Sequence, residues 1–170
     1  DPLYIARRLV RFASEDVGLA DPDALARSLA ARDAIHFIGM PEGALALAQA
    51  TVYLALAPKS NALYKGYGRA KNEVERGENP PVPNHIRNAP TRLMKDLGFG
   101  KGYVYAHDTA EGIADMDCLP ESLKGSEFYR PGGRGYEIEL RDRMERIRQW
   151  HADRRSTADS ATEDTEGKKS

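Results

Sequence analysis

Cysteine and tryptophan are almost absent from this sequence of 170 residues, which has one of each. A lone cysteine, Cys118, cannot form a disulfide within the chain, so the sequence fits a reducing compartment such as the cytosol. An excess of one charge is also lacking, because 25 Lys and Arg residues face 26 Asp and Glu residues. The whole molecule therefore has no strong field that would draw it to nucleic acid or to a membrane surface.

Long apolar runs are scarce as well. The longest covers residues 44–57 and is interrupted by Gln49 and Thr51. A membrane-spanning helix needs about 18 or more apolar residues, so this run predicts a buried central helix and no membrane contact. The chain begins at Asp1 without a methionine and without a basic-then-apolar leader. We therefore expect a fragment or a processed chain that carries no signal peptide.

Motifs for nucleotide hydrolysis are missing. A phosphate-binding P-loop needs a glycine, four residues and then Gly-Lys-Ser/Thr, so that backbone amides surround the phosphates and the hydroxyl reaches magnesium. Gly100 and Lys101 give the nearest match, but Lys95 stands where the first glycine should be and Gly102 where the hydroxyl should be. No Asp-Glu pair follows an apolar strand, and there is no Gly-x-Ser-x-Gly elbow. The sequence predicts no catalytic residue, no bound cofactor and no nucleotide hydrolysis by this chain alone.

Candidate metal ligands are few. His107 adjoins Asp108, and His85 lies nearby in the sequence, so a metal-binding or proton-transfer pair is one interpretation. No third ligand stands at a recognisable spacing, and a zinc site would need further Cys or His ligands. We favour a histidine that is hydrogen-bonded within a packed loop, and we predict no metal site. Cys118 is expected to be a small buried residue.

Helix start and stop signals divide the first half of the chain into four helices. Asp-Pro pairs at 1–2 and 21–22 combine an N-cap with a proline at the first helical position, and a glycine ends each of these two helices. A third helix is expected to begin near Pro41 and to end before Pro58. A fourth is expected within 60–77. Because the connecting turns are very short, the helices should pack antiparallel.

The second half is expected to be irregular as far as about residue 135. Prolines disfavour helix from Glu78 onward. A short helix is predicted at 91–97, and a brief strand or an extended loop at 103–108. A charged helix then runs to about Arg155, after which a tail poor in apolar residues is expected to be disordered. The predicted fold class is all-α: a helical bundle with a long irregular loop region and a C-terminal helix.

One run in the irregular region, 85–108, mixes cations with aromatic rings. It could contact nucleic acid, because cations pair with phosphates and aromatic rings stack on bases. Alternatively, Leu93, Met94, Leu97 and the aromatic rings anchor the loop on the helices while the cations stay in water. From the residues alone we favour the second interpretation, since Asp96 and Asp108 dilute the positive charge. The candidate nucleic-acid contacts are Arg87, Arg92, Lys95, Lys101 and Tyr103.

Four blocks of the sequence resemble one family. They are DPLYIARRLVRFASEDVGLADPDAL, LAQATVYLALAPKSNALY, PVPNHIRNAPTRLMKDLGFGKGYVYAHD and LPESLKGSEFYRPGGRGYE. In this order they are similar to the C-terminal part of the replication-associated recombination protein A family, also called RarA or MgsA. These proteins are AAA+ ATPases related to the Werner helicase-interacting protein. The similarity runs from Asp1 to about Trp150 and departs at 68–81, in the Pro-Gly-Gly segment at 131–133 and in the acidic, serine-rich tail.

The resemblance implies a helical collar, like that of clamp loaders, which holds subunits together as a homotetramer. It implies that residues 1–18 end a preceding lid region, that 19–154 form the C-terminal oligomerisation domain, and that 155–170 are a disordered tail. ATP and Mg²⁺ would bind in an N-terminal domain outside this sequence. The full-length protein would be a cytoplasmic, nucleoid-associated, DNA-stimulated ATPase that maintains replication forks and acts in recombination and repair. Its partners would be DNA and single-stranded-DNA-binding protein.

The subunit contact is expected in the alanine-rich helices between Asp21 and Ala57. They carry more apolar surface than one small bundle needs, and subunit interfaces are usually large and symmetric. Gln49 and Tyr53 are the candidate interface residues. Such a contact would act by raising the effective concentration of one ATPase domain beside its neighbour's site.

Overall fold

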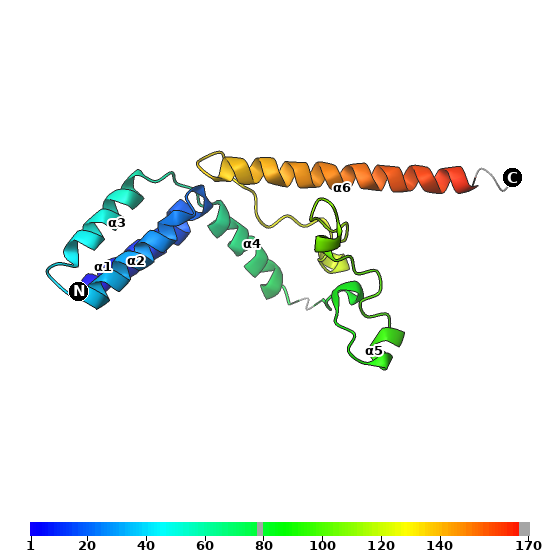
Figure 1. The fold of residues 1–170 in the computed structure, drawn as a ribbon, viewed down its shortest axis with the longest axis horizontal. Helices are drawn as coiled ribbons and strands as arrows, with labels where there is room; N and C mark the ends of the chain where they lie inside the picture. The colour runs from blue at the N-terminus through cyan, green and yellow to red at the C-terminus, as the bar shows by residue number, and fades with distance from the viewer. Residues whose placement is uncertain (78–79, 167–170) are drawn as a thin grey trace. The chain divides into compact units, whose positions relative to one another are not determined.

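The computed structural model describes residues 1–77 and 80–166, with side chains as far as residue 154. The chain divides into two compact units. The first comprises Asp1–Arg76 with Glu127–Arg143, and the second comprises Gly77–Ser126 with Met144–Ser170. The described residues form six α-helices and no strand (Figure 1), so the predicted all-α class is confirmed.

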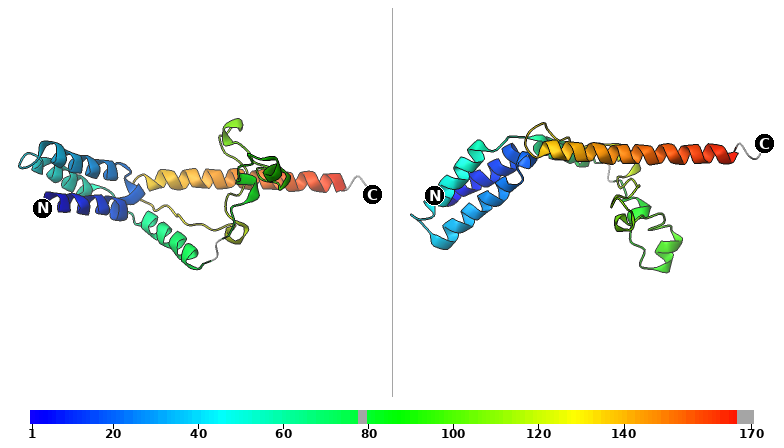
Figure 2. Two further views of the ribbon diagram at one scale, coloured as in Figure 1. Left: turned by 90° about the horizontal axis from the view of Figure 1, so that it is seen from below. Right: turned by 45° about the horizontal axis from the view of Figure 1, so that its top comes forward.

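Three helices of the first unit lie side by side in every view (Figures 1 and 2). They are α1 (Pro2–Phe12), α2 (Asp23–Ile38) and α3 (Ala44–Leu56). The carboxylate of Asp1 accepts a 2.9 Å hydrogen bond from the backbone N–H of Leu3, which caps α1 as the sequence predicted. Past Phe12, α1 continues into one π-helical turn and one 3₁₀ turn.

The boundaries of α2 and α3 follow the same signals. The Asp21 carboxylate accepts from the N–H of Asp23 at 3.1 Å, and Gly39 ends α2 with φ of 72°, in the left-handed region that favours glycine. α3 begins at Ala44, a few residues after the predicted start near Pro41, because residues 40–43 form a turn. It ends at Leu56, before Pro58, as predicted.

Small side chains dominate the core between these helices. One cluster consists of Ala13, Val17, Ala24, Leu54 and Ala57; a second consists of Ala6, Ile35 and Leu47. Alanine at the contacts lets the helix backbones approach closely, while the buried hydroxyl of Ser28 donates to the carbonyl of Ala24 at 2.8 Å. α1 therefore shares its core with α2 and α3. The boundary expected at residue 18 stays a prediction, although residues 1–18 pack in the same unit as the helices that follow.

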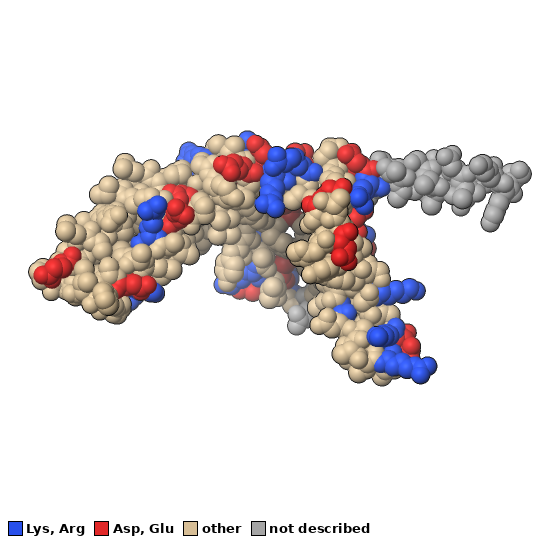
Figure 3. Space-filling view, in the orientation of Figure 1, with Lys and Arg blue, Asp and Glu red and all other residues tan. Residues whose placement is uncertain are grey.

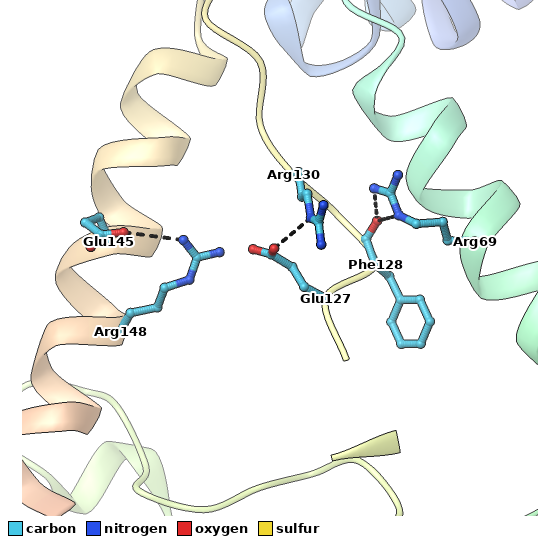
Figure 4. Close-up of polar contacts among 6 residues, drawn as sticks. All are labelled: Arg69, Glu127, Phe128, Arg130, Glu145 and Arg148. Atoms are coloured by element: carbon cyan, nitrogen blue, oxygen red, sulfur yellow. Dashed lines mark hydrogen bonds and ion pairs between the residues drawn. The ribbon is translucent and has the colours of Figure 1, made fainter. Parts of the chain in front are cut away.

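The fourth helix, α4 (Ala62–Glu75), packs against the chain where it returns to the first unit at Glu127–Arg143. A Cβ on Gly66 would stand 2.9 Å from the carbonyl oxygen of Phe128, so only glycine allows this approach. The Arg69 guanidinium donates to the same carbonyl, with Nε at 2.9 Å (Figure 4). Farther along, the N–H of Tyr136 donates to the carbonyl of Ala20 at 2.8 Å.

The second unit is irregular between residues 80 and 126. α5 (Arg92–Asp96) is its short helix, and the hydroxyl of Thr91 caps it by accepting from the N–H of Met94 at 3.3 Å. Residues 103–105 are extended and lead into a 3₁₀ turn at Ala106–Asp108. Of the two alternatives for 103–108, the extended loop is the one observed.

The last helix, α6 (Glu137–Glu166), begins in the first unit and continues into the second. It passes the boundary at residue 155 where the sequence predicted a disordered tail. No proline or glycine interrupts 137–166, and extending an existing helix costs far less than nucleating a new one. Residues 167–170 of the predicted tail lie outside the described residues.

Candidate subunit and nucleic-acid interfaces

One face of α3 is apolar and uncovered. Leu45, Val52 and Leu56 are 79%, 59% and 82% exposed, and α3 contains no charged residue. The opposite face carries the buried Leu47, Ala50 and Leu54. The sequence predicted a buried central helix here, which is correct for one face of α3.

Gln49 lies on the uncovered face of α3. Leu45, Gln49, Val52 and Leu56 follow one another at steps of four, three and four residues, which places them along one side of a helix. Gln49 is exposed, so this candidate interface residue is available to a partner. The space-filling view shows a largely uncharged surface over the three helices of the bundle (Figure 3).

Tyr53, the other candidate interface residue, has partners within its own chain. Its hydroxyl donates to the Asp21 carboxylate at 2.5 Å, and the Arg27 guanidinium lies 4.5 Å from the centre of its ring. The hydrogen bond with Asp21 raises the pKa of Tyr53, because the bond needs the phenol proton. Tyr53 thus joins α3 to the start of α2, and its place in a subunit contact stays a prediction.

The basic-aromatic run of 85–108 lies in the second unit. Arg87 is held there by the chain itself: its Nε donates to the carbonyl of Val82 at 2.7 Å, and its guanidinium lies 4.9 Å from the centre of the Phe99 ring. Leu93 and Leu97 are 68% and 57% exposed. Because the helices of the bundle belong to the other unit, the anchoring of the run on them by Leu93, Met94 and Leu97 stays a prediction. Within its own unit the run is held by turns and by the Arg87 contacts.

The remaining candidate nucleic-acid contacts are open to solvent. Arg92, Lys95 and Lys101 are exposed, and Tyr103 is 52% exposed. Within the part of the chain that the structure describes, none of these three cations has a side-chain hydrogen bond or an ion pair. The structure brings them together on one segment around α5, and their contact with nucleic acid stays a prediction.

Histidines in the second unit take part in local contacts. His85 Nε2 lies 2.7 Å from the carbonyl oxygen of Asp117, and the rings of His107 and Tyr105 are 4.9 Å apart. Among the described residues, no group of three or more His, Cys, Asp or Glu side chains could hold a metal ion. Cys118 is exposed, so the prediction that it is buried is wrong. It lies in an irregular segment that has little apolar core of its own.

Sequence reasoning missed a cluster of cations in the first unit. Lys65 and Arg69 on α4 line a cavity together with Arg130 and Arg134 from the returning chain. Some 60 residues of sequence separate the two halves of this cluster. The alternating tyrosines and cations at 64–71 were the signal that could have indicated it.

None of the helices in the described ranges combines the length and the apolar content that crossing a membrane requires.

Comparison with known proteins supplies the family. Residues 1–148 match the family model described as MgsA AAA+ ATPase C terminal. The chain belongs to this family. The chain is 50% identical over 161 residues to the replication-associated recombination protein A of Coxiella burnetii, an alignment that covers 94% of the chain and 37% of that relative. The corresponding Escherichia coli K12 protein is 45% identical over 145 residues, which cover 85% of the chain and 32% of the relative.

The relatives extend to eukaryotes. The ATPase WRNIP1 of Dictyostelium discoideum is 49% identical to this chain over 131 residues, which cover 76% of the chain and 15% of that relative. The chain spans about a third of the length of the two bacterial relatives. The resemblance found in the sequence is therefore confirmed for the family.

Proposed function

We propose that this chain is the assembly module of a longer AAA+ ATPase of replication and recombination, and that it joins subunits as a homotetramer. The observation that carries the proposal is the uncovered apolar face of α3. Leu45 and Leu56 each leave about four fifths of their surface in water, although both sit on a helix whose other face is fully packed. Burying such side chains contributes roughly 1.5–3 kcal/mol each, so a partner surface on this face is strongly favoured.

A second copy of the same chain is the occupant that fits this face best. α3 has no charged residue, and a face without charges cannot select a charged partner. Apolar positions spaced by four and three residues pair well with an identical helix, because side chains then interdigitate along both helices. Closed symmetric assemblies are the usual outcome when the same patch is used by every copy.

The test is the solution mass of the 170-residue chain by light scattering over a wide concentration range. A tetramer is expected, and Leu45→Lys with Leu56→Lys should lower the mass to that of smaller species without lowering the thermal midpoint. Val74→Lys is the matched control, because Val74 is also apolar and 76% exposed but lies on α4. A wild-type chain that is monomeric at every concentration contradicts the proposal. An unchanged mass in the double variant contradicts the location of the contact.

A second function is proposed for the run around α5. Arg92, Lys95 and Lys101 are exposed cations beside the exposed ring of Tyr103, a combination that suits single-stranded or junction DNA. Arg92→Ala with Lys95→Ala should weaken binding of DNA and reduce its dependence on salt. Equal binding of DNA by wild type and variant at every salt concentration would show that the run around α5 does not contact DNA.

Other parts of the proposal concern the full-length protein. ATP and Mg²⁺ would bind outside these residues, and DNA would stimulate the ATPase. Single-stranded-DNA-binding protein would be a partner, and the protein would work in the cytoplasm at the nucleoid. The family and the names of its relatives support the ATPase activity and the role in replication-associated recombination, since the relatives are called replication-associated recombination proteins and an ATPase.

A further inference from the structure

A basic cavity lies in the first unit, where the end of α1, the start of α4 and the returning chain meet. Its volume is about 630 Å³, within the range of about 300–1,000 Å³ that is typical of small-molecule sites. Its charged lining consists of Lys59, Lys65, Arg69, Arg130 and Arg134, with the carboxylates of Asp16 and Glu137. Five cations and two acids therefore surround one small space.

The wall of the cavity at the start of α6 is closely built. Glu137 is fully buried, and its two carboxylate oxygens accept from the hydroxyl of Tyr129 at 2.9 Å and from the N–H of Gly132 at 2.8 Å. A Cβ on Gly132 would stand 2.6 Å from Oε2 of Glu137 and 3.3 Å from the hydroxyl oxygen of Ser60. Only glycine fits there, so this part of the returning chain is fixed against α4 and α6.

Two of the five cations belong to the wall as well. Lys59 Nζ donates to the carbonyls of Leu54 at 2.7 Å and Ala55 at 3.3 Å, at the C-terminal end of α3. The guanidinium of Arg69 is fixed by its bonds to the carbonyl of Phe128 (Figure 4). Both positive charges are thus held in place at the cavity by backbone carbonyls.

The other three cations keep donors for a ligand. Arg130 donates from Nε to the Glu127 carboxylate at 2.8 Å (Figure 4), and both of its terminal nitrogens remain. Lys65 and Arg134 are exposed, and within the described residues their side chains have neither a hydrogen bond nor an ion pair. The lining therefore offers charged donors that the fold does not use.

The start of α4 adds to the positive field in the cavity. Ala62 is the first residue of this helix of 14 residues, and it lines the cavity together with Ser60 and Asn61. The N-terminal end of a helix carries partial positive charge. This charge supplements the attraction that the side chains already exert on an anion.

The number of free donors favours an anion with several charges. Lys65, Arg130 and Arg134 together keep about 12 N–H donors. One carboxylate has a single charge and about four lone-pair sites, whereas one phosphoryl group has a charge of about −1.5 to −2 at neutral pH and three strong acceptor oxygens. Two joined phosphoryl groups therefore match these donors better than a carboxylate or a single phosphate does.

We propose that this cavity binds a diphosphate group. The forked N–H donors of Arg69, Arg130 and Arg134 suit pairs of phosphate oxygens, and Lys65 adds a mobile point charge. The phosphates of a nucleic-acid strand carry one charge each and follow one another along the strand, whereas these cations converge on one enclosed space. The site shares no residue with the uncovered face of α3 or with the run around α5, so it is independent of both functions proposed above.

The test is isothermal titration calorimetry of the 170-residue chain with sodium diphosphate at constant ionic strength. One diphosphate should bind per chain, and it should raise the thermal midpoint of the wild type. Lys65→Ala with Arg134→Ala should weaken binding by about tenfold or more, because two charge-assisted contacts are lost. Both residues are exposed, so without ligand the variant should unfold at a midpoint close to that of the wild type.

Arg7→Ala with Arg32→Ala is the matched control, since it removes two cations of the first unit that do not line the cavity. It should change the affinity for diphosphate by less than about twofold. An equal loss in this control and in the cavity variant would overturn the proposal, because binding would then follow net charge alone. A wild-type chain that shows neither binding heat nor a higher midpoint at millimolar diphosphate would overturn it as well.

Other anions identify the ligand class. Orthophosphate and citrate should each bind at least about tenfold more weakly than diphosphate, because the first has fewer charges and the second offers carboxylates. Equal binding of citrate would show that the cavity attracts any multivalent anion. Displacement of diphosphate by oligothymidylate at the same concentration of phosphate groups would assign the cavity to a nucleic-acid strand. Either of these two results contradicts the proposal.

Methyl diphosphate distinguishes the two sources of the group. An affinity equal to that of free diphosphate would mean that a larger molecule can present the group to the cavity. A loss of about tenfold or more would restrict the site to the free anion. Both results agree with a diphosphate site, provided that Lys65→Ala with Arg134→Ala weakens the binding of the anion that binds more tightly.

Discussion

The hydroxyl of Tyr129 donates a 2.9 Å hydrogen bond to Oε1 of Glu137, a carboxylate with no exposed surface. The other oxygen of Glu137 accepts from the backbone N–H of Gly132. Glu137 is the first residue of α6, where a negative charge is favoured by the helix dipole. These contacts tie the returning chain to the start of α6 and shape one wall of the basic cavity.

Replacing Tyr129 by phenylalanine should lower the free energy of unfolding by about 1–3 kcal/mol, because a buried carboxylate then loses one of its two donors. Urea denaturation followed by circular dichroism measures the change. Tyr64→Phe is the control: Tyr64 is exposed, and its variant should unfold within about 0.5 kcal/mol of the wild type. Equal stability of all three proteins would show that the Tyr129 bond contributes nothing.

The same pair predicts a dependence on alkaline pH. Burial, and then the bond to Glu137, raise the pKa of Tyr129 above its ordinary value, which is about 10 in an unfolded chain. The native state therefore keeps the phenol proton at a pH where the unfolded state has lost it. The stabilisation is complete below about pH 10 and declines as the pH rises further, by at most about 1.4 kcal/mol per pH unit. The stability difference between wild type and Tyr129→Phe should thus shrink between about pH 10 and pH 12. If this difference in unfolding free energy grew with pH, the pKa of Tyr129 would be lowered by folding and not raised.

Two glycines of α4 should respond in opposite directions to alanine. Gly66→Ala would place a Cβ 2.9 Å from the carbonyl oxygen of Phe128, so the returning chain must shift, and we expect a loss of roughly 1–3 kcal/mol. Gly68→Ala meets nothing within 4 Å and should gain up to about 1 kcal/mol from better helix propensity. The thermal midpoints of the two variants, compared with that of wild type, test the expected loss for Gly66→Ala and the expected gain for Gly68→Ala. A loss of equal size in both would mean that helix propensity, and not the contact with Phe128, governs these sites.

Thr109 should hold the loop that follows the 3₁₀ turn at Ala106–Asp108. Its Oγ1 lies 2.7 Å from the carbonyl oxygen of Ala106 and accepts from the N–H of Ile113 at 3.0 Å. Thr109→Val keeps the shape and removes both bonds, so the amide of Ile113 should exchange with solvent roughly tenfold faster. Thr109→Ser, which retains the hydroxyl, should restore slow exchange. Fast exchange in the serine variant would show that the methyl group, rather than the hydroxyl, orders the loop.

The helices of the first unit could be predicted from the sequence because their signals are local. Asp1 and Asp21 cap α1 and α2, Gly39 ends α2, and Pro58 limits α3. Each of these effects acts within one turn of backbone. The long irregular segment was also predictable, since the prolines at 80, 81, 83, 90 and 120 disfavour long helices between residues 80 and 126.

The candidate sites depended on contacts that no local pattern reports. The hydroxyl of Tyr53 donates a hydrogen bond to Asp21, 32 residues earlier in the sequence. Lys65 and Arg134 line the same cavity only because Gly66 lets the returning chain approach α4. The exposed position of Cys118 was missed for a related reason. Apolar character indicates burial only where enough other apolar side chains are at hand, and the irregular second unit supplies few.

The polar residue on the uncovered face of α3 gives a further test of assembly. Gln49 occupies one of four positions in line with Leu45, Val52 and Leu56, and a polar side chain at such a position fixes the register of paired helices at some expense of stability. Gln49→Arg should prevent pairing, because it would bury a charge that has no partner in an identical helix. Gln49→Leu should strengthen assembly about tenfold or more and permit species other than the tetramer.

Sedimentation velocity over a range of concentrations distinguishes these outcomes for Gln49. The arginine variant should sediment as smaller species, with a circular dichroism spectrum and a thermal midpoint close to those of wild type, since Gln49 is exposed. Glu42→Arg, which changes an exposed residue just before α3, is the control and should assemble normally. Wild-type assembly by Gln49→Arg would exclude this face of α3 from the contact, because no close pairing of apolar helices tolerates two unpaired arginines at its centre.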